Sequence, residues 1–169
     1  MTDPSHSSAV TVATLHSLVG RSFAPSEWIV VDQERIDAFA ACTGDHQFIH
    51  VDPERVARET AFSGTLAHGF LLLSLAAGHR QRDFPAVSDV ALVLNYGLDR
   101  LRFTSPVVAG SRVRYRSRVL AAEPRAPGRV LLRQEAMMEV EGQDKPAVIA
   151  ELLALYVARG EQETGTPVP

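Results

Sequence analysis

The sequence has little of what identifies several large classes of protein. It contains a single cysteine, Cys42, so the chain can form neither an internal disulfide nor a zinc site of several thiolates, which suits a reducing compartment. Its formal net charge is -3, without the basic excess of a nucleic-acid-binding protein. No apolar run reaches the ~20 residues of a membrane-spanning helix, and the start does not resemble a secretory signal. We therefore expect a cytoplasmic protein that binds neither nucleic acid nor membrane.

Several catalytic motifs are also missing. The sequence has no G-x-S-x-G elbow, no G-x-x-x-x-G-K-[ST] phosphate loop and no G-x-G-x-x-G fingerprint after a strand. These absences disfavour hydrolases with a serine nucleophile elbow and nucleotide-binding enzymes. The spacing of the acidic residues and histidines matches no strong metal signature, so the sequence predicts neither a cofactor nor a metal.

The composition is that of an ordinary globular protein. The chain has 169 residues, of which 46% are hydrophobic and 22% charged, enough for one domain with a proper core. Both ends are polar and have little to bury. We expect a disordered leader over residues 1–13, a single domain over 14–160 and a flexible tail over 161–169.

The first half of the domain has helical signals with a break between them. Asp32 can cap a helix whose apolar positions include Ile36 and Phe39, and Gly44 should end it because glycine tolerates the left-handed conformation. The pair Asp52-Pro53 can start another helix, since Asp caps free N–H groups and Pro fits the first turn.

The segment between these helices carries two residues that can do chemistry. Because the glycine forces the chain out of its helix, we expect a turn or an extended segment there. Asp45 and His50 would then lie on a loop between two helices.

The second half alternates in the manner of strands. Residues 68–78 are apolar nearly all round, which predicts a helix buried on almost every side. Strand character follows over 89–98, 101–103, 111–120, 129–141 and 145–158. In the fourth of these, alternate residues form one apolar face, and only Gln134 breaks the pattern. Helices followed by antiparallel strands indicate an α+β fold in which one hydrophobic helix lies on a curved sheet.

Three ordered blocks resemble one family. The segment FAACTGDHQFIHVDPERV, residues 39–56, resembles the G-D-x-N-P-[hydrophobic]-H-x-D signature of MaoC-like dehydratases and R-specific enoyl-CoA hydratases. The blocks GTLAHGFLLLSL, residues 64–75, and NYGLDRLRFTSPVVAGSRVR, residues 95–114, resemble the same family, and more closely its nodulation-protein-N-like branch. The resemblance spans about residues 15–158. It implies a hot-dog fold, an antiparallel sheet wrapped around a central hydrophobic helix.

The resemblance also implies an activity. Members hydrate trans-2-enoyl-CoA to (R)-3-hydroxyacyl-CoA and need no cofactor, since the coenzyme A thioester is the substrate. Asp45 and His50 would hold the catalytic water, and the backbone amide of Gly69 would donate to the thioester carbonyl. The family also implies a homodimer. We favour Asp45 as the base that activates water, although the sequence leaves the division of protons between the pair open.

Further residues are expected to contact the substrate. Gln47 and Phe48 stand where the family has Asn-Pro, and with His68 and Phe70 they are predicted to bind substrate. Some members support the catalytic Asp with a serine on the central helix, where this sequence has Ala77.

Alternatives remain at this point. Asp45 could simply form a turn, and His50 could be a core histidine bonded to a backbone carbonyl. The four alternating arginines of residues 112–118 either form a solvated face or meet the phosphates of coenzyme A. At the level of function, an acyl-CoA thioesterase and a non-catalytic acyl-CoA-binding subunit remain open, because one fold can serve several functions.

Overall fold

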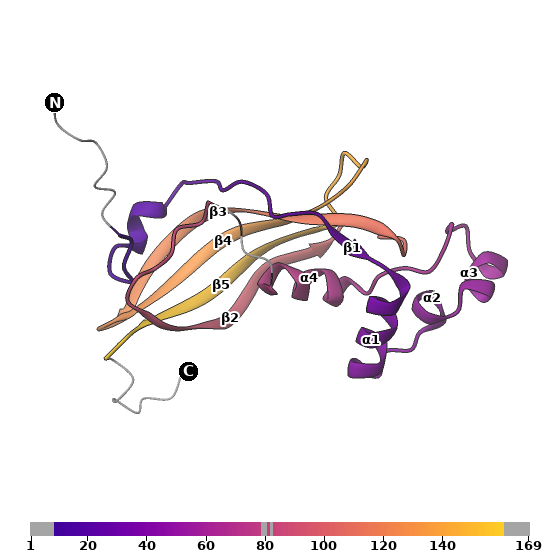
Figure 1. Cartoon of the computed structure of the whole chain (residues 1–169), viewed down its shortest axis with the longest axis horizontal. Helices are drawn as coiled ribbons and strands as arrows, with labels where there is room; N and C mark the ends of the chain where they lie inside the picture. Colours follow the sequence, from indigo (N-terminus) through magenta and orange to yellow (C-terminus); the bar gives the residue numbers. More distant parts are fainter. Residues whose placement is uncertain (1–8, 79–80, 82, 161–169) are drawn as a thin grey trace.

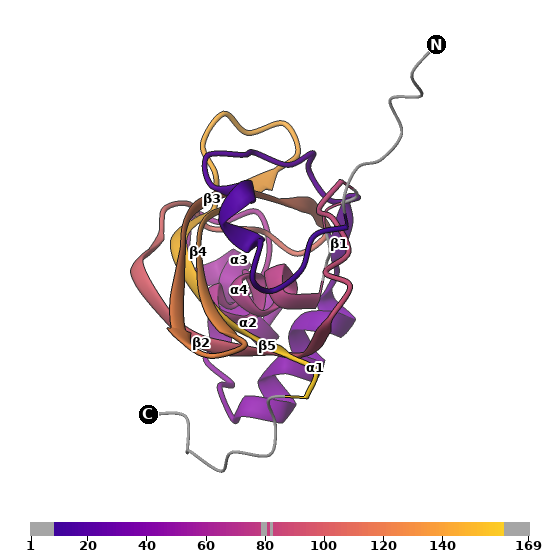
Figure 2. The ribbon, with the colours of Figure 1, turned by 90° about the vertical axis from the view of Figure 1, so that its left-hand side faces the viewer.

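The centre of the fold is one curled antiparallel sheet. The computed structural model describes residues 9–78, 81 and 83–160. Its strands are β1 (Ile29–Val31), β2 (Val90–Phe103), β3 (Ser111–Ala126), β4 (Arg129–Val140) and β5 (Val148–Ala158), in the spatial order β1-β3-β4-β5-β2. Every pairing is antiparallel. The sheet curls around helix α4 (Gly69–Gly78), as the side view in Figure 1 and the end-on view in Figure 2 both show.

The strands are longer and fewer than the sequence patterns predict. Segments 89–98 and 101–103 are one strand, β2, because a bulge between Asp99 and Arg102 carries the pairing with β5 across the interruption. Arg100 takes up the distortion with a φ of 51°, unusual for a residue with a side chain. Strand β3 continues to Ala126, since it stays paired with β4 as far as Arg129.

Three short helices lie beyond one end of the sheet. They are α1 (Gln33–Thr43), α2 (Phe48–Val51) and α3 (Pro53–Glu59). The predicted caps are confirmed: Asp32 accepts from the amide of Arg35 at 2.9 Å, and Asp52 accepts from that of Arg55 at 2.9 Å. Gly44 ends α1 in the left-handed conformation, with φ 79°.

The placement of His50 on a loop was wrong. His50 lies in α2, a single helical turn closed by the amide of Asp52, which donates to the carbonyl of Phe48 at 2.9 Å. The side-chain amide of Gln33 holds this turn by donating to the carbonyl of His50 at 2.8 Å. Such a long-range contact has no signature in a local pattern. Asp45 does lie on the loop between α1 and α2.

Helix α4 is covered on one side only. Leu71, Leu72 and Leu75 are buried against the sheet, as predicted. The expectation of burial on nearly every side was wrong, because Phe70 is 61% exposed and Ser74 is exposed too. The curl of a single sheet reaches only part of the way round, so an apolar helix is left with an open side.

The described N-terminal residues pack more closely than the predicted leader allows. Val12 is buried, and its amide donates to the carboxylate of Asp89 at 2.8 Å, so the end of the predicted segment 1–13 belongs to the domain. Residues 1–8 and the predicted tail 161–169 lie outside the described residues. Among the described residues, no helix is long and apolar enough to cross a membrane.

Gly44→Ala should destabilise the fold by about 1–2 kcal/mol, because a side chain at φ 79° strains the backbone. An added Cβ would meet no atom within 4 Å, so the cost is conformational alone. The measurement is the free energy of unfolding in urea. Gly78→Ala is the matched control, since it has equal space and no positive φ, and it should be neutral or stabilising. Equal losses in both variants would contradict this explanation.

Candidate active site

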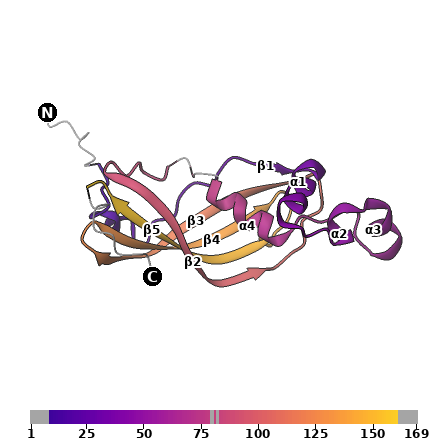
Figure 3. The same ribbon diagram turned by 90° about the horizontal axis from the view of Figure 1, so that it is seen from below.

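Two histidines and a carboxylate meet where α1, α2 and α4 approach one another, at the end of the sheet seen in Figure 3. Asp45, His50 and His68 each present one ligating atom, and these atoms all lie within 4.8 Å of one another. The two imidazole rings are stacked, with centroids 3.7 Å apart and planes 22° from parallel. The sequence pattern predicted the first two residues as a pair, and the structure adds the third to them.

His50 has a defined protonation pattern. It is buried, and its Nδ1 lies 2.7 Å from the carbonyl oxygen of Leu66. Because a carbonyl can only accept, Nδ1 carries the proton, and in the neutral ring Nε2 keeps its lone pair. The amide of Leu66 in turn donates to the carbonyl of Ile49 at 2.8 Å, so the acceptor is itself fixed. His50 is thus both the core histidine of the alternative reading and a group with one free acceptor nitrogen.

His68 connects the histidine pair to the aspartate. It is buried, and its Nε2 donates to the backbone carbonyl of Asp45 at 3.0 Å. Its Nδ1 is buried with no hydrogen-bond partner among the described residues. The other side of the ring contacts Phe39, with centroids 5.0 Å apart. This places His68 beside Asp45 and His50, where its hydrogen bond holds the main chain that carries the carboxylate.

Asp45 is exposed and forms a turn. One carboxylate oxygen accepts from the amide of Gln47 at 3.4 Å, and the amide of Asp45 donates to the hydroxyl of Thr43 at 3.4 Å. The turn-forming interpretation is therefore correct as geometry. It does not compete with a chemical role, because a carboxylate offers about four acceptor positions and the turn occupies one.

A second set of contacts fixes α2 against α1. The amide of Gln33 donates to the carbonyl of His50 and also to Asp37, the latter at 2.7 Å. Its amide oxygen accepts a short hydrogen bond from the hydroxyl of Thr65. Gln33 lies outside the three blocks that resemble the family, and Thr65 lies within the block 64–75, but nothing in the sequence pattern singles out either residue.

Gly69 opens α4 and is closely covered. A Cβ atom there would lie 2.8 Å from the ring of Phe103, so only glycine fits without displacing that ring. The first amides of a helix have no intrahelical acceptor and lie at its positive end. The backbone amide of Gly69 therefore suits the predicted role of donor to an oxygen that develops negative charge.

The other predicted binding residues lie around the pair. Gln47 is exposed at the start of α2, and the ring of Phe48 lies 4.1 Å from the guanidinium carbon of Arg55. Phe70 is exposed and contacts Phe103 edge-on, with centroids 5.5 Å apart.

The helix offers no serine to the aspartate. Ser74 donates its hydroxyl to the carbonyl of Phe70 within the same helix, at 2.8 Å. Ala77, which stands at the place of the family's supporting serine, lines a cavity instead. Next to α4, it is His68, the residue before the helix, that contacts Asp45, through the hydrogen bond to its backbone carbonyl.

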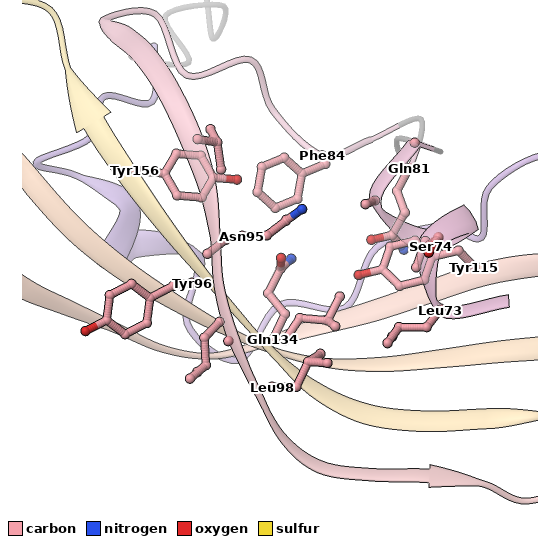
Figure 4. A pocket seen from close by; sticks show the side chains of 18 of the residues that line it. Leu73, Ser74, Gln81, Phe84, Asn95, Tyr96, Leu98, Tyr115, Gln134 and Tyr156 are labelled. Carbon is pink, nitrogen blue, oxygen red and sulfur yellow. The ribbon is translucent and has the colours of Figure 1, made fainter. Parts of the chain in front are cut away.

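That cavity has a volume of about 670 Å³ and lies beside the second half of α4 (Figure 4). Its other walls are formed by strands β2 and β5, by Tyr115 of β3 and Gln134 of β4, and by the loop residues Gln81, Phe84 and Val87. On α4 its wall begins at Leu73, four residues after Gly69, which is about 6 Å along the helix at ~1.5 Å per residue. Asp45, His50, Gln47, Phe48, His68 and Phe70 are not among the residues that line it.

The arginines of β3 are paired across the sheet. Arg112 bonds Glu141 at 2.8 Å, while Arg114 and Arg116 bond Glu139 at 2.6 and 3.2 Å. Arg114 also lies 4.5 Å from the ring of Trp28. These contacts support the solvated-face interpretation for the three arginines.

Comparisons with known proteins identify the class. A family model described as MaoC like domain matches residues 14–137. Nodulation protein N of Rhizobium leguminosarum bv. viciae is 44% identical over 146 residues, covering 86% of this chain and 91% of the relative. The 3-hydroxyacyl-thioester dehydratase Z of Mycobacterium tuberculosis (strain ATCC 25618 / H37Rv) is 43% identical over 148 residues, covering 88% and 97%.

Solved structures agree on the fold. The (R)-hydratase from A. caviae involved in PHA biosynthesis superposes with a TM-score of 0.59 at 27% identity, covering 80% of this chain and 94% of that one. R-hydratase PhaJ1 from Pseudomonas aeruginosa, in the unliganded form, gives a TM-score of 0.65 at 23% identity, covering 95% and 96%. The chain belongs to the MaoC-like domain family. Its hot-dog fold and its resemblance to the nodulation-protein-N-like branch are confirmed.

Gly69→Ala should destabilise the protein by about 1–3 kcal/mol, because the new Cβ forces the ring of Phe103 aside. Phe103→Leu in the same chain should recover part of this loss by relieving the clash. A double-mutant cycle on the free energy of unfolding measures the coupling between the two positions. Strictly additive losses would show that the ring is not what excludes the side chain.

Proposed function

We propose that this protein is an R-specific enoyl-CoA hydratase, which adds water reversibly to trans-2-enoyl-CoA and gives (R)-3-hydroxyacyl-CoA. The observation that carries the proposal is the convergence of Asp45 with His50, each of which presents one ligating atom within 4.8 Å of the other. The hydrogen bond from Nδ1 to Leu66 leaves Nε2 as the acceptor nitrogen of His50. The printed names of the relatives, a 3-hydroxyacyl-thioester dehydratase and two R-hydratases, support this class of reaction.

The two side chains can hold one water molecule. In the neutral state of His50, both Nε2 and the carboxylate are acceptors, so one water donates a hydrogen bond to each and turns a lone pair outward. That lone pair attacks C3 of the enoyl group. As the C3–O bond forms, the water loses one proton to the pair, with Asp45 as the base and His50 as the second, water-orienting acid/base, and the electrons of the C2–C3 double bond move toward the thioester carbonyl. The pair then returns one proton to C2, so that it ends in its starting protonation state.

The thioester carbonyl needs its own partner. As C3 is attacked, negative charge grows on the thioester oxygen. The amide of Gly69, at the N-terminus of α4, donates to this oxygen. The acyl chain continues along α4 into the 670 Å³ cavity, a volume within the usual ~300–1,000 Å³ of small-molecule sites.

Asp45→Asn and His50→Gln should each lower kcat for crotonyl-CoA hydration by about 10²- to 10⁴-fold, the usual contribution of a positioned acid or base. The assay follows loss of the enoyl-thioester absorbance. A parallel assay follows thiol release, and the hydration assay is repeated after the protein has been dialysed against EDTA. We expect hydration without thiol release and without sensitivity to EDTA.

His46→Gln is the matched control, because this histidine is exposed between the two candidates and should keep full activity. Circular dichroism checks that all variants fold. Thiol release in place of hydration would identify a thioesterase, and acyl-CoA binding without turnover would identify a non-catalytic subunit. Either result would overturn the proposal, and loss of activity with EDTA would overturn the metal-free mechanism.

We also propose that the protein forms a homodimer through β2. This strand is the free edge of the sheet, and its exposed side chains are largely apolar: Leu92, Val93, Leu94, Tyr96, Leu98 and Phe103. A long apolar edge is a template for pairing with another chain. The open side of α4 adds apolar surface that a second copy would cover.

Leu94→Asp should convert the dimer to a monomer, because Leu94 is 36% exposed on β2 and does not line the cavity. Sedimentation velocity at micromolar concentration measures the state. Val19→Asp is the control: Val19 is 46% exposed but lies outside the sheet, and this variant should remain dimeric. A monomeric parent protein, or a Leu94→Asp variant that is still dimeric, would contradict the proposed interface.

A further inference from the structure

The cavity beside α4 has a polar wall. Among its lining residues are Gln81, Asn95, Tyr115 and Gln134, which come from a loop, β2, β3 and β4 respectively. Figure 4 shows the amides of Asn95 and Gln134 and the hydroxyl of Tyr115 directed toward the same space. An acyl pocket for a plain alkyl chain needs none of these groups.

Gln134 occupies a position that the sheet would normally give to an apolar residue. It lies between Leu132 and Ala136, both buried on the inner face of β4. Placing an amide there costs free energy unless its groups are hydrogen-bonded. The sequence already shows this residue as the one exception in an alternating strand.

A chain of hydrogen bonds holds the amide of Gln134 in place. Its nitrogen donates to the hydroxyl of Ser117 at 3.3 Å, and Ser117 donates to the side-chain oxygen of Gln81. The nitrogen of Gln81 donates to the backbone carbonyls of Phe23 and Ala24, at 3.2 and 3.0 Å. Ser117 and Gln81 are buried. The chain ends on fixed backbone atoms, so the amide head is oriented before any ligand arrives.

Asn95 and Tyr115 complete the wall. The register of β2 against β5 shifts between Asn95 and Gly97, and such a bulge redirects side chains locally. Tyr115 is buried, and this burial raises the pKa of its phenol, so the hydroxyl is neutral and able to donate at physiological pH. Of the described residues that line the cavity, none carries a charge.

From this wall we infer that the cavity selects an acyl chain that carries an uncharged oxygen function, a hydroxyl or a keto group, beyond the reacting double bond. The inference rests on the proposed function, which places the acyl chain in this cavity. The helix wall runs from Leu73 to Gly78, about 6 to 14 Å along α4 from Gly69 at ~1.5 Å per residue. The oxygen function therefore lies well away from the thioester. An alkyl chain would displace water from the amides and return no hydrogen bond to them.

The test compares affinities and needs no turnover. Isothermal titration calorimetry measures Kd for octanoyl-, decanoyl- and dodecanoyl-CoA and for their ω-hydroxy forms. We expect the hydroxylated thioester to bind about 3- to 10-fold more tightly at one or more chain lengths, the gain from one well-placed hydrogen bond. Gln134→Leu, which keeps the size but removes the amide, should abolish or invert this preference.

Leu98→Met is the matched control, because it changes the same cavity without changing a polar group and should keep the preference. Asn95→Leu gives an independent loss of a polar group if Gln134→Leu unfolds, which its melting temperature reports. Alkyl forms that bind as tightly as hydroxylated ones at every length in the parent protein would overturn the inference. Hydration of crotonyl-CoA, whose chain is short, separately reports whether the proposed function itself holds.

Discussion

The hydrogen bond from His50 Nδ1 to the carbonyl of Leu66 is the contact on which the site depends. It decides which nitrogen of the ring carries the proton and so leaves the other as an acceptor. It also joins two stretches of chain that no secondary structure connects, the short helix α2 and the segment that leads into α4. This hydrogen bond therefore holds α2 against the segment that leads into the N-terminus of α4.

The second histidine, His68, strengthens this connection between α2 and the start of α4. His68 lies face to face with His50 and donates to the carbonyl of Asp45, so the loop, α2 and the start of α4 share one packed unit. The stacked rings and the two hydrogen bonds to backbone carbonyls thus fix the orientation of both imidazoles relative to the Asp45 loop.

Much of this could be predicted from the sequence, for physical reasons that are local. The caps at Asp32 and Asp52 and the left-handed Gly44 depend only on residues a turn away, and alternation on β4 reports directly which face is buried. The pairing of Asp45 with His50 came from a motif. The structure brings the two residues together, and the catalytic role of each stays a prediction.

What the sequence did not indicate depends on distant contacts. The helical state of Phe48–Val51 is fixed by Gln33, and that glutamine by Thr65, which is far along the chain. The open side of α4 reflects how far one sheet can curl, which is a property of the whole layer. The cavity was not predicted either, although Gln134 is one of its lining residues. A polar residue that breaks the alternation of a strand indicates a polar position on the inner face of the sheet, but it does not show which residues lie opposite.

The close fit of Phe103 over Gly69 puts the edge strand β2 in direct contact with the start of α4. Phe103 is the last residue of β2, and its ring touches the position where α4 begins. A shift of β2 along the sheet would therefore press on the helix terminus with no intervening side chain to absorb it. The edge of the sheet and the first turn of α4 are therefore mechanically coupled, so a contact that steadies β2 also steadies the backbone amide of Gly69.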